Sequence, residues 1–118
     1  MKIAIGCDHG GYLLKQDILI WLEEHDIDFE DMGCFSTESV DYPVYAEKVA
    51  RAVAAGECSK GIVICTTGIG VSMAANKVGG VRCALCTDCL QAEMTRRHND
   101  ANVLAPVSYT HLRAHETV

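Results

Sequence analysis

The 118-residue sequence lacks the positive charge that nucleic-acid binders carry, because ten Lys and Arg residues stand against sixteen Asp and Glu. With a formal net charge of -6, we expect no nucleic-acid partner. The chain also lacks any run approaching the roughly 18 apolar residues of a membrane span. Its first residues, MKIAIGCDHGG, do not read as a secretory signal. We therefore expect no membrane partner and a cytoplasmic location.

A disulfide framework is not expected either. Seven cysteines are many for this length, but the number is odd and no secretory signal accompanies them. Cys83, Cys86 and Cys89 share a three-residue spacing that is found among metal and iron–sulfur ligands. The first two fall on opposite faces of a predicted strand, however, and no nearby fourth ligand completes a site. We therefore predict buried small apolar residues, no metal and no cofactor; a cysteine-based metal or redox protein is the disfavoured alternative.

Short apolar runs alternate with amphipathic stretches along the chain, which predicts one domain of βαβ units. Strands are predicted over residues 2–6, 27–30, 61–65, 81–86 and 102–105. Helices are predicted after Gly10-Gly11, across 45–53, from the turn at 66–70 to about 77, and over 88–97. The expected fold is α/β, Rossmann-like and three-layered, with a mainly parallel sheet. Ligands of such sheets bind outside the carboxyl ends of the strands, so the segments after the strands carry the candidate site.

The first such segment reads GCDHGG and places Asp8 and His9 directly after the first strand. Its glycines permit close approach of the backbone, and the N-terminus of the following helix attracts anions. Asp8 and His9 are therefore candidate ligands of a small anionic substrate. The alternative is a tight strand-to-helix turn in which Asp8 merely caps the helix.

The second segment is the turn Thr66-Thr67-Gly68-Ile69-Gly70, which follows a strand ending at Cys65. Successive backbone N–H groups in such a turn form a nest for an oxyanion or a phosphate. The turn is neither a Walker loop nor a complete G-x-G-x-x-G fingerprint. Because a helix N-terminus favours a thiolate, Cys65 is a candidate base, and Thr67 can donate its hydroxyl to the same anion. The alternative is a structural cysteine before an ordinary turn.

The third segment, Arg96 to Asn102, contains His98 and Asn99 and by itself reads equally well as a solvated turn. Together, the three segments supply a thiol, imidazoles, a carboxylate, an amide and an N–H nest near strand ends. Nothing indicates a nucleotide, a metal cage or a serine nucleophile elbow. Aldose–ketose isomerisation needs an imidazole for ring opening, a base and donors for the developing oxyanion. We therefore predict a cofactor-independent isomerase of a small sugar phosphate.

Four segments, GCDHGG, DYPVYA, ICTTGIGVSMAANK and RRHNDANVLA, match the ribose-5-phosphate isomerase B family in order and spacing, over residues 1–105. This family also holds galactose-6-phosphate and allose-6-phosphate isomerases. The resemblance implies interconversion of ribose 5-phosphate and ribulose 5-phosphate, and the HND sequence favours a pentose. It also implies a homodimer, often paired into tetramers, with active sites built across the dimer interface. The implied catalytic residues are Cys65 as proton acceptor, His98 as ring-opening acid and Thr67; the implied substrate ligands are Asp8, His9, Tyr42, Thr66, Gly68, Ile69, Gly70 and Asn99.

The chain departs from the family pattern at two places. Thr66 stands where glycine is usual, which leaves its N–H available but crowds the anion loop. The resemblance stops at Ala105, and residues 106–118 carry no apolar helical face where the family continues into a phosphate-gripping end. We therefore expect a fold truncated at its C-terminal end, a foreign tail over 106–118, and no phosphate-binding role for Arg113. The alternative function is a phosphosugar-binding module with little or no turnover.

Overall fold

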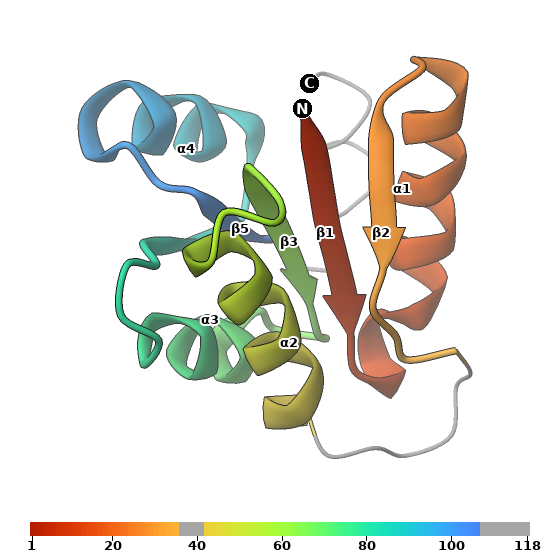
Figure 1. The fold of residues 1–118 in the computed structure, drawn as a ribbon, viewed down its shortest axis with the longest axis horizontal. Coiled ribbons are helices and arrows are strands. Elements are labelled where there is room, and N and C mark those ends of the chain that lie inside the picture. Colours follow the sequence, from red (N-terminus) through yellow and green to blue (C-terminus); the bar gives the residue numbers. More distant parts are fainter. Residues whose placement is uncertain (36–41, 107–118) are drawn as a thin grey trace.

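The structure, a computed structural model, describes residues 1–35 and 42–106, and of Tyr42 only the backbone. Its five strands run parallel in one sheet, in the order β2-β1-β3-β5-β4 (Figure 1). The strands are β1 (Lys2–Cys7), β2 (Asp28–Asp31), β3 (Lys60–Ile64), β4 (Cys83–Cys86) and β5 (Val103–Pro106). The helices are α1 (Tyr12–Glu24), α2 (Tyr42–Ala54), α3 (Ile69–Asn76) and α4 (Cys89–Met94), with a 3₁₀ turn η1 (His9–Gly11) and a π-helical turn η2 (Thr95–Asn99). The predicted α/β fold is confirmed.

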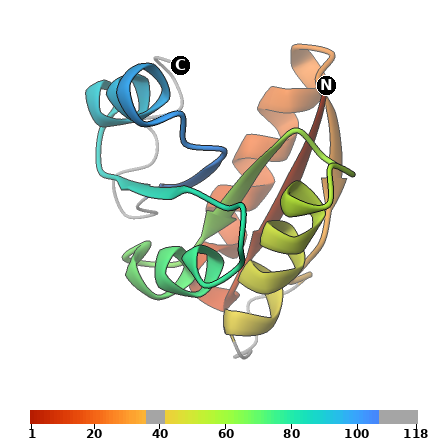
Figure 2. The same cartoon turned by 60° about the vertical axis from the view of Figure 1, so that its left-hand side comes forward.

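Helices that connect parallel strands almost always make a right-handed crossover. When two such connections run in opposite directions along the sheet, their helices therefore lie on opposite faces of it. The chain passes from β1 to β2 through α1 on one face, and from β2 through β3 to β4 by way of α2 and α3 on the other. Figure 2 shows α2 and α3 together in front, with α1 behind the sheet. The strand order reverses between β1 and β3, so the ligand-binding crevice of a doubly wound sheet is expected at their carboxyl ends.

Each face of the sheet has its own apolar core. Because successive strand residues point to opposite faces, Ala4 packs with α2 whereas Ile5 packs with α1. The α1 core contains Leu14, Ile18 and Leu22, which share one face of that helix. The core under α2 and α3 is built from small and β-branched residues: Val49, Val53, Val63, Val71 and Val103. Both cores reach the strand ends that carry the predicted site.

One predicted strand is shorter than its sequence pattern suggests. The apolar run begins at Val81, but β4 begins at Cys83. Gly80 has a φ of 88° in the preceding turn, and the N–H of Arg82 donates to the side-chain oxygen of Asn102 at 2.8 Å. Strand pairing therefore begins only with Cys83, beside Val103.

The carboxyl ends of β1 and β3 are in direct contact. The N–H of Asp8 donates to the carbonyl of Ile64 at 3.0 Å, one residue beyond the last pair of the β1–β3 ladder. Gly11, buried where η1 joins α1, packs against the same carbonyl: a Cβ on Gly11 would lie 2.6 Å from it. The first turn of α1 can approach β3 this closely only because position 11 has no side chain.

We predict that Gly11→Ala lowers the free energy of unfolding by about 1 to 3 kcal/mol, the usual cost of forcing atoms into a packed site. The measurement is urea unfolding of both proteins. Gly79→Ala is the matched control, because a Cβ on Gly79 would meet nothing within 4 Å. Equal stabilities of the two variants would show that the β1–β3 edge is not closely packed.

Candidate active site

The first loop of the candidate site is the turn from Cys7 to Gly11 at the end of β1. The Oδ1 atom of Asp8 accepts the N–H of Gly11 at 3.1 Å and thereby caps η1. The capping alternative is thus correct for this oxygen. His9 is exposed at the same edge. The loop presents an imidazole and a carboxylate next to the end of β3.

The second loop contains Cys65, which directly follows β3 and is 7% exposed. The N–H of Gly68 donates to its Sγ atom at 3.1 Å, and Gly68 reaches this position with a left-handed φ of 77° at the start of α3. The hydroxyl of Thr67 accepts the N–H of Ile69 at 3.3 Å. An N–H donor and the N-terminus of α3 together favour negative charge at this turn.

The two loops are in contact through Thr66 and Gly10. A Cβ on Gly10 would collide with the Oγ1 atom of Thr66 and would lie 3.3 Å from the Oδ1 atom of Asp8. The threonine that stands in place of the usual glycine therefore packs over the first loop. The structure brings Asp8, His9 and the turn from Cys65 to Gly70 together, as predicted.

The other thiols near the sheet are poor candidates for a base at neutral pH. Burial, with a further contribution from Cys34, raises the pKa of the Cys7 thiol to about 12. Burial also raises the pKa of Cys83 to about 12 and increases the pKa of Cys58 and of Cys86. These thiols stay protonated near neutrality. Cys65, which follows β3, lies instead in a turn where the N–H of Gly68 donates to its Sγ atom.

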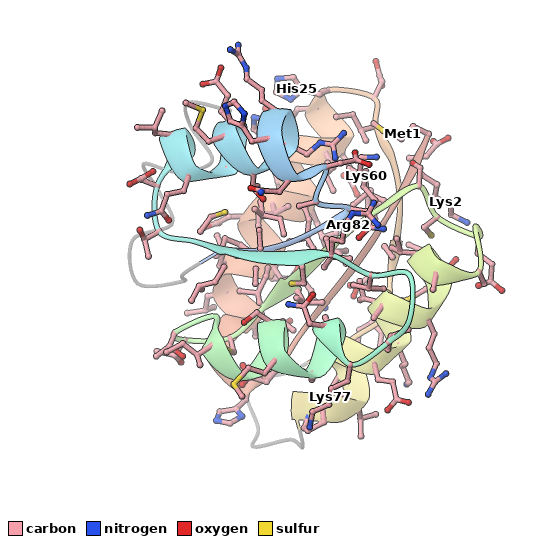
Figure 3. The ribbon with its side chains drawn as sticks, turned by 90° about the vertical axis from the view of Figure 1, so that its left-hand side faces the viewer. Met1, Lys2, His25, Lys60, Lys77 and Arg82 are labelled. Atoms are coloured by element: carbon pink, nitrogen blue, oxygen red, sulfur yellow. The ribbon has the colours of Figure 1, made fainter. Side chains whose placement is uncertain are left out.

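His98 and Asn99 lie away from this site. They are exposed in η2, which precedes β5, and the carbonyl of Asn102 accepts the N–H of Gly61 near the amino end of β3 at 2.9 Å. In Figure 3 the labelled Lys60 and Arg82 lie near α4, whereas α3 lies at the opposite end of the sheet. Since Cys65 follows the carboxyl end of β3, one chain does not place His98 beside Cys65.

The turn after His98 is held by two arginines. Asp100 has a left-handed φ of 49°. Its carboxylate forms ion pairs with the guanidinium groups of Arg82 at 3.4 Å and Arg96 at 3.2 Å. Arg82 also donates to the backbone carbonyl of Asp100 at 2.8 Å, and Arg96 donates to that of Ala101. The polar segment predicted as either a site or a solvated turn is therefore an exposed turn with a fixed backbone.

Tyr42 begins α2, but its side chain lies outside the described residues, so its predicted role is untested. The sequence patterns also missed Lys15, which is fully buried beneath the first loop. The spacing along α1 could have indicated this burial. Lys15 stands three residues before Ile18 and seven before Leu22, so it lies on the apolar stripe of the helix.

Over residues 1–35 and 42–106, no group of three or more His, Cys, Asp or Glu side chains is arranged to hold a metal ion. No helix in the same ranges is long and apolar enough to cross a membrane. A groove of about 820 Å³ lies by α4 and the amino ends of β3 and β5, lined by Ile62, Leu90 and Leu104 among others. It is separate from the loops that follow β1 and β3.

The fold and the two loops define an α/β domain with a candidate small-ligand site at the switch point of a parallel sheet. Residues 3–110 match the family model described as Ribose/Galactose Isomerase. Ribose-5-phosphate isomerase B of Escherichia coli is 51% identical over 104 residues, which cover 88% of this chain and 70% of that protein. A putative sugar phosphate isomerase of Bacillus subtilis is 52% identical over 106 residues, 89% of this chain and 71% of its own length.

Solved structures agree with this relationship. Ribose-5-phosphate isomerase B of Clostridium thermocellum matches with a TM-score of 0.90 and 53% identity, covering 94% of this chain and 74% of that one. The Thermotoga maritima protein matches with a TM-score of 0.89 and 44% identity over 91% and 74% of the two chains. The chain therefore belongs to the ribose/galactose isomerase family, and it is an enzyme of the aldose–ketose isomerase class.

Proposed function

We propose that this chain interconverts ribose 5-phosphate and ribulose 5-phosphate through an enediolate, without a cofactor. The observation that carries the proposal is the placement of Cys65, whose Sγ atom accepts an N–H in the turn before α3, beside the loop that carries Asp8 and His9. The relatives named ribose-5-phosphate isomerase B support a pentose phosphate as substrate. We also place the enzyme in the cytoplasm.

The chemistry follows from the arrangement of the two loops. The Cys65 thiolate takes the proton from C2 of the open-chain aldose, and the electron pair moves to make the enediolate. The same sulfur returns the proton to C1 while the hydroxyl proton of O2 moves to O1, which leaves the carbonyl at C2 and gives the ketose. N–H groups of residues 66–70 and the Thr67 hydroxyl stabilise the oxyanion, because fixed donors need no reorganisation as charge develops. Asp8 and His9, with Tyr42 and Asn99, bind the sugar phosphate.

We expect Cys65→Ala to lower kcat for ribose 5-phosphate by about 100-fold or more, the contribution of a general base. Steady-state kinetics of the purified chain provide the test. Single Ala variants at Cys83, Cys86 and Cys89 are the controls and should keep near-normal turnover. Normal turnover of Cys65→Ala would remove Cys65 from the mechanism. An intact chain that binds ribose 5-phosphate without converting it would favour a phosphosugar-binding module instead.

We further propose that the chain works as a homodimer in which His98 and Asn99 of the partner subunit complete each site. Within one chain these residues lie toward the opposite end of the sheet from Cys65. In a dimer, His98 of the partner subunit can lie beside Cys65 and serve as the acid for ring opening. Ile69 and Met73 on α3 are exposed apolar side chains next to the Cys65 turn, and an association surface would cover them.

Subunit mixing tests this assembly. Cys65→Ala and His98→Asn chains should each be impaired alone, but a heterodimer of the two should regain about half of the wild-type kcat, because a two-fold interface then contains one intact site. Co-expression with two different affinity tags yields the heterodimer. If the heterodimer has no more activity than the single variants, Cys65 and His98 of one active site belong to the same chain.

We also propose that the stretch after β5 is not part of the isomerase core. The expected tail begins at Pro106, but Pro106 ends β5 and pairs with Cys86 of β4, so the proposal concerns residues 107–118. The support is their sequence, since the stretch VSYTHLRAHETV contains no apolar stripe of helical period. The isomerase core thus comprises residues 1–106, and Arg113 is given no role in phosphate binding.

A further inference from the structure

A fully buried lysine of α1 forms an ion pair with a partly buried carboxylate at the end of β2. The Nζ atom of Lys15 is 2.7 Å from the Oδ1 atom of Asp31, and the side chain of Lys15 is 0% exposed. The same Nζ atom donates to the backbone carbonyl of Cys34. It also lies 4.8 Å from the ring centroid of Phe35 and 5.6 Å from that of Tyr12. A lysine is buried this deeply only where such partners replace water.

The partners of Lys15 belong to one turn at the end of β2. Asp31 accepts the N–H of Gly33 at 3.0 Å with the oxygen that binds Lys15. Lys15 therefore crosslinks α1 to both ends of the segment from Asp31 to Cys34. The ion pair and its hydrogen bonds fix the position of this segment against the helix.

The fixed turn in turn holds the end of β1. The N–H of Cys7 donates to the carbonyl of Gly33 at 2.7 Å, and the N–H of Cys34 donates to the carbonyl of Cys7 at 2.9 Å. Cys7 directly precedes Asp8 and His9. An unbroken set of hydrogen bonds thus leads from Lys15, through the Asp31–Cys34 turn, to the loop that presents the proposed substrate ligands.

We infer that Lys15 is a positioning residue for substrate binding: through Asp31 and the Cys34 carbonyl, it sets the place of Asp8 and His9. The inference rests on the proposed function, which makes these two residues substrate ligands. Lys15 itself does not touch the substrate, because its side chain is enclosed. Its loss affects binding more than proton transfer, since Cys65 stands on the other loop and is held by Gly68.

The test is Lys15→Met in the full chain, a change that keeps much of the volume and removes the charge. Amide hydrogen exchange, read by mass spectrometry, should accelerate about tenfold in residues 7–11 and 31–35 and stay unchanged in α3, because local opening is confined to the released segments. The KM for ribose 5-phosphate should rise about tenfold, with kcat changed by less than about threefold.

Lys2→Met is the matched control. Lys2 also pairs with a carboxylate of β2, Glu30 at 3.2 Å, but this pair is about half exposed and Lys2 lies at the amino end of β1 (Figure 3). Its loss should change neither the exchange of residues 7–11 nor the KM. An equal effect of Lys2→Met, a uniform acceleration that includes α3, or a loss of kcat at constant KM would overturn the inference.

Asp31→Asn decides the question if Lys15→Met fails to fold, because the amide keeps the shape and weakens the ion pair. It should raise the KM and the exchange of residues 7–11 in the same direction by a smaller factor; an unchanged KM with unchanged exchange would overturn the inference. If the unaltered chain shows no turnover, the proposed function fails. Even then, the amide hydrogen exchange rate of residues 7–11 in Lys15→Met shows whether Lys15 positions this loop.

Discussion

The hydrogen bond from the Asp8 N–H to the Ile64 carbonyl joins the two loops on which the chemistry depends. It extends the β1–β3 ladder past the last paired residues, so the loops leave the sheet from one fixed point. Gly11 then brings the start of α1 against the same carbonyl, and Gly10 admits the Thr66 side chain between the loops. A side chain at position 10 would collide with the Thr66 hydroxyl, and one at position 11 would collide with the Ile64 carbonyl.

Burial divides the charged groups of this protein into two kinds. In the Lys15–Asp31 pair the lysine is fully buried and the carboxylate is partly exposed, so removing Asp31 leaves a buried ammonium without its ionic partner. The pairs of Asp100 with Arg82 and Arg96 are solvent-exposed, and such pairs contribute little to stability. The exposed pairs instead fix the backbone of the turn that carries His98. One end of the sheet thus carries a preorganised thiol site, and the other carries an accessible imidazole.

Much of the fold could be predicted from local patterns, because apolar runs and helical spacing mark the elements of a parallel sheet. The turn around Cys65 and the GCDHGG loop could also be placed together, since the carboxyl ends of adjacent parallel strands share one edge. The distance of His98 from Cys65 was not found in this way. The order of elements contains this separation, since His98 precedes a parallel strand and Cys65 follows one, but the polar segment was grouped with the other two by its residue types alone. Lys15 was missed because periodicity describes apolar residues and assigns lysines to the surface.

The measurement that tests the account most directly is the isomerisation of ribose 5-phosphate in D₂O, followed by NMR of the sugar carbons. A thiol base that holds the substrate proton exchanges it with the medium in part of the turnovers, while the enediolate is bound. Proton transfer by Cys65 predicts deuterium at C1 of part of the ribulose 5-phosphate formed, and loss of both conversion and labelling in the Cys65→Ala chain. Deuterium at C1 at an undiminished rate in the Cys65→Ala chain would show that another group moves the proton and would contradict proton transfer by Cys65.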